Sequence, residues 1–249
     1  MTRQHVGRAT EAQKLMYLAP CPADATPAQV TPKWAEHLRG IMALEQVGPI
    51  VTRYEITQLF SPADDPTLPG ALFGPGLISD AWGCVGQAWL TGGMEALGEL
   101  AALPEVIEAR SHEAEILGSS IENSFLFQDE LIYDRGDTNI KIFSWLKRQP
   151  NLTLDEFADQ WRDFIDLFLT HDELVSRSQM YIQSHVFDPT GAGDARFDGV
   201  AIMGFSSVEQ MLDFMGQPSL VEELFPAEAP WLDRTQGVVV VGRPEVLKG

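Results

Sequence analysis

The chain has 249 residues, of which 45% are hydrophobic and 21% charged, as expected for a globular protein with one or two domains. Its formal net charge of -19 argues against binding to nucleic acid or to an anionic membrane surface, because both need clustered Lys and Arg. Two cysteines without metal-like spacing, and no apolar run of about 20 residues, predict a cytoplasmic protein with reduced thiols and no membrane span.

The first half of the chain predicts strands and helices from sequence patterns that are weaker than those of the second half. The expected strands are 14–19, 52–60, 82–87 and 124–128, and the expected helices are 31–46 and 91–100. A polar, turn-rich linker follows at 134–139.

The second half gives the clearer pattern. A strand is predicted at 140–145, and the capping box formed by Thr153 and Glu156 opens a helix. The apolar face of this helix recurs at three- and four-residue spacing: Phe157, Trp161, Phe164, Ile165 and Phe168. Strands follow at 179–187, 199–205 and 237–242, with a helix capped by Ser206 or Ser207 before the last of them.

The two halves are related by an internal repeat. Subtracting 127 from the later number pairs identical residues: Lys141 with Lys14, Thr153 with Thr26, Trp161 with Trp34, Tyr181 with Tyr54 and Phe187 with Phe60. The repeat predicts an α+β fold of two tandem ferredoxin-like β-α-β-β-α-β units, at 12–133 and 138–249. Each predicted sheet has one face without helices, so we expect the two sheets to pack together as a barrel.

Alternation along the strand 179–187 separates two faces. Met180, Ile182, Ser184 and Val186 suit packing under helices, so Tyr181, Gln183, His185 and Phe187 are predicted to line an inward cavity. Their counterparts in the first half are Tyr54, Ile56, Gln58 and Phe60. Lys141, Phe143 and Trp145 share one face of the strand 140–145 and are expected to complete the cavity wall.

Two histidines are candidates for proton transfer, because histidine titrates near neutral pH. His171 follows the predicted helix, where the alternative is an exposed side chain stabilised by the helix dipole. For His185 the alternative is an inward histidine satisfied by backbone or water. Asp198 is interpreted as a turn or capping residue. The GAGD segment at 191–194 lacks the setting of a phosphate-binding loop, and the five histidines lack metal-ligand spacing.

Several segments of the second half together resemble a known family. They are IKIFSW (140–145), LKRQPNLTLDEF (146–157), Trp161, HDELV (171–175), YIQSHVFD (181–188), FDGVAIMGFSSVEQM (197–211) and LDR (232–234). This half is similar to the EthD family of the dimeric α+β barrel superfamily. The resemblance implies the barrel fold, and either a small-molecule enzyme without organic cofactor or an accessory pathway protein. His171 with Leu174 and Val175 looks like the family's histidine and its following apolar segment.

The residues and the resemblance together predict a cofactor-independent enzyme of lyase, dehydratase or isomerase type, acting on a hydrophobic aromatic or polycyclic metabolite. The predicted catalytic residues are His185, His171 and Tyr181, and the predicted substrate-binding residues are Lys141, Phe143, Trp145, Gln183, Phe187, Tyr54 and Gln58. Neither a metal nor an organic cofactor is predicted, and a homodimer is left open. The alternatives are a non-enzymatic ligand-binding or accessory protein and a haem-binding protein. Whether His171 and His185 share one cavity also stays open.

Overall fold

The chain forms two compact units in this computed structural model, which describes residues 8–65, 81–121, 124–187 and 196–249. What we call the first unit contains Thr10–Asp129 together with Val240–Gly249, and the second unit contains Glu130–Val239 and, of the described residues before Thr10, residues 8–9. The GAGD segment at 191–194 lies outside the described residues. Among the described residues, no helix combines the length and the apolar character needed to cross a bilayer.

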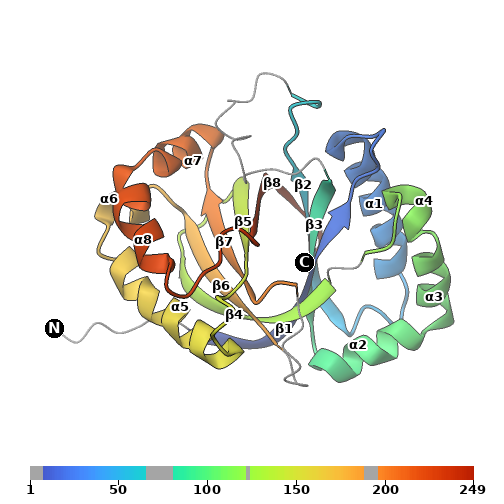
Figure 1. The fold of residues 1–249 in the computed structure, drawn as a ribbon. Coiled ribbons are helices and arrows are strands. Elements are labelled where there is room, and N and C mark those ends of the chain that lie inside the picture. Colours follow the sequence, from blue (N-terminus) through green and yellow to red (C-terminus); the bar gives the residue numbers. More distant parts are fainter. Residues whose placement is uncertain (1–7, 66–80, 122–123, 188–195) are drawn as a thin grey trace. The chain divides into compact units, whose positions relative to one another are not determined.

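The first unit is built on antiparallel strands in the order β1-β3-β2-β8 (Figure 1). Its elements are β1 (Arg8–Pro20), α1 (Pro27–Met42), β2 (Val51–Leu59), β3 (Trp82–Leu90), α2 (Gly93–Ala102), α3 (Pro104–Ser111), α4 (Glu113–Leu117), the start of β4 (Ser124–Asp134) and most of β8 (Val238–Lys248). Residues 242–248 therefore pair with β2 although they follow the second unit in the sequence.

The second unit has the strand order β5-β7-β6-β4, with β7 antiparallel to both β5 and β6. Its elements are β5 (Ile140–Leu146), α5 (Leu154–Phe168), α6 (Asp172–Val175), β6 (Met180–Val186), β7 (Gly199–Phe205), α7 (Val208–Met215), the π-helix η2 (Leu220–Leu224) and α8 (Phe225–Glu228). The prediction of a mixed α+β fold is confirmed. The tandem ferredoxin-like detail, its boundaries at 12–133 and 138–249, and the packing of sheet against sheet stay predictions.

The helix expected at 31–46 begins and ends four residues earlier than predicted. Its N-cap is Thr26, whose backbone N–H donates to Gln29 Oε1 at 3.0 Å, and Asp64 accepts from the backbone N–H of Ala28 at 2.9 Å. These acceptors satisfy N–H groups that a helix start leaves open. Thr26 is also the repeat counterpart of Thr153, so the repeat marks this helix start correctly.

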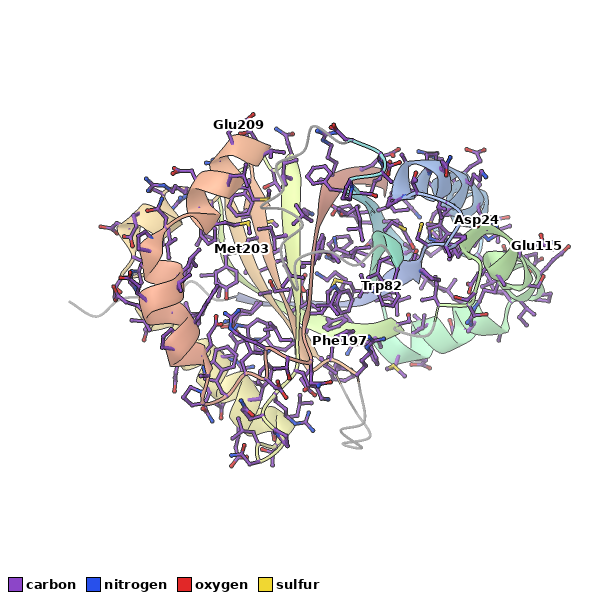
Figure 2. All side chains as sticks on the ribbon, turned by 45° about the horizontal axis from the view of Figure 1, so that its top comes forward. Asp24, Trp82, Glu115, Phe197, Met203 and Glu209 are labelled. Atoms are coloured by element: carbon purple, nitrogen blue, oxygen red, sulfur yellow. The ribbon has the colours of Figure 1, made fainter. Side chains whose placement is uncertain are left out.

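Acidic residues concentrate where solvent reaches them, and aromatic residues fill the interior of each unit. Figure 2 shows Asp24, Glu115 and Glu209 on outer surfaces of their units, and all three side chains are exposed. Phe197, labelled in the same view, is fully buried. This distribution agrees with an acidity that serves solubility.

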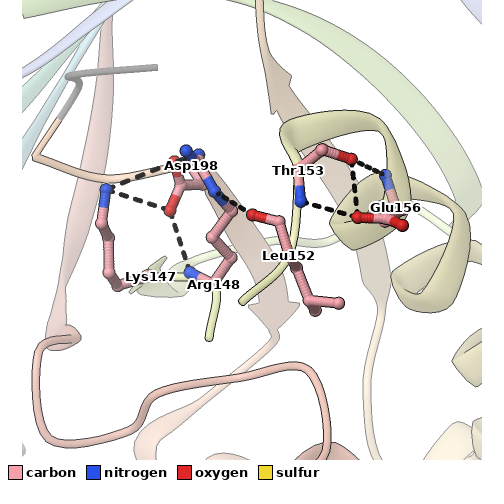
Figure 3. A network of polar contacts seen from close by, with 6 residues as sticks. All are labelled: Lys147, Arg148, Leu152, Thr153, Glu156 and Asp198. Carbon is pink, nitrogen blue, oxygen red and sulfur yellow. Dashed lines mark hydrogen bonds and ion pairs between the residues drawn. The ribbon is translucent and has the colours of Figure 1, made fainter. Parts of the chain in front are cut away.

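The entry into α5 is fixed by the buried carboxylate of Asp198 (Figure 3). Asp198 accepts from the backbone N–H of Arg148 at 2.9 Å, pairs with the Arg148 guanidinium, and lies 3.2 Å from Lys147 Nζ. Arg148 Nε in turn donates to the carbonyl of Leu152 at 3.0 Å, directly before the N-cap Thr153. Asp198 therefore ties the loop before α5 to the start of β7.

Candidate functional site

The strand registers place the predicted site residues of the second unit on two opposite faces of its sheet. Gln183 pairs with Ala201, which pairs with Ser144, so Tyr181, Gln183 and His185 share a face with the even-numbered residues of β5. Lys141, Phe143 and Trp145 point to the other face.

The face that carries Tyr181, Gln183 and His185 lies under α5. The Tyr181 ring centroid is 5.2 Å from that of Phe168, and the His185 ring is 4.7 Å from that of Trp161. The prediction that these residues face away from the helices is therefore wrong. Polar groups are tolerated beneath the helix because α5 itself binds them: Gln183 Nε2 donates to the Trp161 carbonyl at 3.0 Å.

A glycine makes room for the contact between Trp161 and His185. Gly199 on β7 is the cross-strand partner of His185. A Cβ placed on Gly199 would lie 2.5 Å from Cζ3 of Trp161, which is closer than carbon atoms approach. The missing side chain thus allows the indole to lie against the sheet beside the imidazole.

The hydrogen bonds of Gln183 define the orientation of its amide and the tautomer of His185. The amide NH₂ donates to the Trp161 carbonyl and to the Tyr181 hydroxyl, so the amide oxygen faces His185. His185 Nε2 is 3.2 Å from this oxygen. Because an amide oxygen only accepts, neutral His185 carries its proton on Nε2, and Nδ1 holds the lone pair.

A carboxylate stands beside the same imidazole. Glu130, in the middle of β4, has Oε2 at 3.7 Å from His185 Nε2, and Arg162 Nε on α5 is 3.1 Å from that oxygen. The carboxylate would stabilise a protonated His185, while Arg162 holds the carboxylate in place. Sequence patterns contain no signal for Glu130, because this pairing joins residues of three separate elements.

Tyr181 is completely enclosed by its neighbours. Burial raises the pKa of its hydroxyl well above the ordinary value, although hydrogen bonds from Trp161 and Gln183 act in the opposite direction. Tyr181 therefore stays neutral at physiological pH, and its hydroxyl helps to hold the amide of Gln183.

His171 lies apart from His185. Its Nδ1 is 3.1 Å from Glu173 Oε1 and its Nε2 is 3.8 Å from Glu223 Oε2. His185 lies beside Trp161, whereas His171 follows Phe168, two turns or about 10 Å further along α5. The two predicted catalytic histidines thus occupy opposite ends of the contact between α5 and β6.

The remaining predicted residues of the second unit have different surroundings. Phe143 and Trp145 are completely buried, Trp145 against the ring of Phe197, and Lys141 is 8% exposed. Phe187 is at the surface. Among the described residues there is no group of three or more His, Cys, Asp or Glu side chains arranged to hold a metal ion.

In the first unit, the equivalents of Tyr181 and His185 also face a helix. Tyr54 and Tyr17 share a hydrogen bond of 2.5 Å between their hydroxyls, and Trp34 Nε1 of α1 donates to Tyr17 at 2.9 Å. Gln58, the counterpart of His185, lines a pocket of about 560 Å³.

Comparison with known proteins relates the second half to one family. Residues 149–235 match the family model of the EthD domain, so the predicted resemblance of this half to that family is confirmed. The match includes α5, β6 and β7, which surround His185. No curated protein matches the sequence.

Solved structures with low sequence identity share the fold over nearly the whole chain. An anthrone oxidase-like protein has a TM-score of 0.62 at 11% identity, covering 96% of this chain and 95% of that chain. A "putative monooxygenase" of Fusobacterium nucleatum has a TM-score of 0.52 at 7% identity, covering 95% and 92%. A "putative chlorite dismutase" has a TM-score of 0.50 at 11% identity, covering 94% of both chains. These similarities show a mixed α+β fold with neighbours in the dimeric α+β barrel class, and they show the fold alone.

Proposed function

We propose that the chain is a cofactor-independent enzyme that transfers a proton on a small aromatic or polycyclic molecule, with His185 as the acid–base group. The supporting observation is the hydrogen-bonded series Trp161–Gln183–His185, which fixes one tautomer of the imidazole beside the carboxylate of Glu130. General bases are commonly oriented in this way by a second polar group.

In the proposed reaction, Nδ1 of neutral His185 accepts a proton from a carbon next to a substrate carbonyl. The electron pair of the broken C–H bond moves into an enolate, and Glu130 stabilises the imidazolium. Return of the proton to another carbon gives an isomer. Delivery of the proton to a departing hydroxyl gives water and a dehydrated product. Tyr181 and Gln183 act as positioning residues, since their polar groups bind Trp161, His185 and each other.

The proton transfer can be measured before the natural substrate is known. The probe is 2-tetralone in D₂O buffer without added cofactor, and catalysed C–H exchange appears as a mass increase and loss of the proton NMR signal. We expect the wild-type protein to accelerate exchange, and His185→Gln to lower this acceleration about 100-fold or more. Glutamine is the residue of the first repeat at this position, so the substitution is moderate in size.

The matched control is His171→Leu, which also installs the first-repeat residue. Since His171 lies away from His185 and is surrounded by carboxylates, its loss should leave exchange within about twofold of wild type. Equal rates for wild type and His185→Gln would contradict the proposed role, and so would a rate lost with His171 instead. Binding of 2-tetralone without exchange would favour the alternative of a non-enzymatic binding or accessory protein.

The haem-binding alternative has weaker support from the geometry of the two histidines. The His185 ring packs against Trp161 and its Nε2 faces Gln183 and Glu130, while both ring nitrogens of His171 face carboxylates. Nε2 of His185 and both ring nitrogens of His171 already face polar side chains, which disfavours axial ligation through these atoms. We expect no Soret shift when haem is titrated into the purified protein.

A further inference from the structure

The pocket of the first unit is separate from the histidine site and has its own chemistry. It measures about 560 Å³, within the range of small-molecule sites. It is lined by one side of α1, the end of β2, the following residues 60–65 and part of β8. The residues are Ala28, Thr31, Pro32, Ala35, Arg39, Ile56, Gln58, Leu59, Phe60, Ser61, Asp64, Asp65, Arg243, Pro244 and Glu245.

The pocket exists because α1 carries small side chains where it passes β2. Ala28, Thr31 and Ala35 follow one another at helical spacing on the lining side. In the repeat, Ala35 corresponds to Arg162, whose long side chain reaches Glu130 in the second unit. Replacing that arginine by alanine leaves open space above Gln58.

Two of the acidic groups around the pocket are already engaged. The carboxylate of Asp64 accepts from the backbone N–H of Ala28 and from the Thr26 hydroxyl. Glu245 forms an ion pair with Arg39 across the rim. These contacts connect α1 with β8 and with the segment after β2. The ion pair with Glu245 also neutralises the charge of Arg39, which is then not available to bind a ligand.

Arg243 and Gln58 offer a guanidinium and an amide to a ligand, in a lining that also includes a third carboxylate, Asp65. Within the described part of the chain, neither the guanidinium of Arg243 nor the amide of Gln58 takes part in an ion pair or a side-chain hydrogen bond. The guanidinium lies 5.2 Å from the centroid of the Phe60 ring, so cation and aromatic ring form one edge of the pocket. Ile56 and Pro32 add apolar wall.

We propose that this pocket binds small planar aromatic carboxylates. The carboxylate would pair with the guanidinium of Arg243, whose fork of N–H groups matches two oxygens. The ring system would pack on Phe60 and Ile56, and the Gln58 amide would donate to an oxygen on the ligand. This proposal does not depend on the role of His185, because all its residues belong to the first unit.

The test is calorimetric titration of the full chain with 2-naphthoate, compared with neutral 2-naphthalenemethanol and cationic 2-naphthylmethylamine. We expect one equivalent of 2-naphthoate to bind, and both other probes to bind at least about tenfold more weakly, because only the acid can use Arg243. Arg243→Gln should remove the preference for the acid, and Arg243→Lys should restore part of it.

Two variants serve as controls. Arg110→Gln removes an exposed arginine of the same unit that pairs with Glu113 outside the pocket, and it should bind 2-naphthoate like wild type. His185→Gln should also bind normally, which separates this site from the proposed active site. The proposal is overturned if 2-naphthoate does not bind at millimolar concentration, if the alcohol binds equally well, or if Arg243→Gln retains the preference for the acid.

Discussion

At the scale of single residues, the two glycines closest to aromatic rings determine where those rings lie. The Trp161 ring packs against Gly199 beside His185. In the first unit the Tyr17 ring packs against Gly86, where an added Cβ would lie 2.1 Å from the Tyr17 ring. Both positions sit on central strands where only a missing side chain permits such contact.

Gly199→Ala should therefore destabilise the protein by about 1–3 kcal/mol, the usual cost of inserting a methyl group into a filled interior. It should also displace Trp161 from His185 and lower catalysed exchange of 2-tetralone. Urea unfolding measures the first effect. The control is Gly98→Ala in α2, where nothing lies within 4 Å of the added carbon and the expected change is stabilising, about 0.5–1 kcal/mol.

The two cysteines should differ strongly in reactivity. Cys84 is completely buried, and this burial raises the pKa of its thiol well above the ordinary value, whereas Cys21 is partly exposed. Only the thiolate attacks disulfide reagents. Ellman's reagent at pH 8 should detect one thiol in the folded wild type and both in guanidinium. Rapid reaction of the folded Cys21→Ser variant would contradict this assignment.

At the scale of elements, helix starts follow from local sequence better than sheet faces do. The capping box at Thr153 was predictable from four consecutive residues, and α5 begins where it indicates. The first helix was predicted four residues late, although Thr26 is its N-cap as Thr153 is that of α5.

The face of β6 could not be read from the strand alone. Alternation separates Tyr181, Gln183 and His185 from Met180 and Ile182, but it does not state which set lies under a helix. That choice depends on the Trp161 carbonyl and on the space at Gly199, both distant in sequence. The pairing of His185 with Glu130 was hidden for the same reason.

The cap of α5 offers a direct measure of how firmly this helix is held. Thr153 Oγ1 accepts from the backbone N–H of Glu156 at 3.2 Å, and Glu156 Oε2 accepts from the backbone N–H of Thr153 at 2.8 Å. Thr153→Ala should reduce the free energy of unfolding by about 1 kcal/mol, because a helix N–H loses its partner. Thr153→Ser keeps the hydroxyl and should unfold within a few tenths of a kcal/mol of wild type in urea.

At the scale of the whole molecule, all four tyrosines have the same electrostatic character, although Tyr133 is only partly buried and the other three are buried. Burial is the largest cause that raises the pKa of Tyr17, Tyr54, Tyr133 and Tyr181. Two belong to each unit, so neither unit carries a tyrosine that ionises normally.

This character predicts a steep loss of stability in alkaline solution. Unfolded tyrosines release protons near pH 10, while the folded ones retain them, so the stabilising effect is complete below pH 10 and is lost as the pH rises above it. The free energy of unfolding should fall by up to about 1.4 kcal/mol per pH unit for each tyrosine. Absorbance at 295 nm should rise together with unfolding measured by circular dichroism. A gradual rise near pH 10 in folded protein would contradict this.

The pairing of residues 242–248 with β2 has a consequence for the order of synthesis. A ribosome makes β2 early, but the strand that covers its open edge emerges only after the entire second unit. During translation the edge of β2 that β8 later covers is therefore unpaired. Unpaired strand edges can pair with strands of other chains. Completion of the first unit is postponed until the second unit has been synthesised, so slow elongation would prolong its exposure to aggregation.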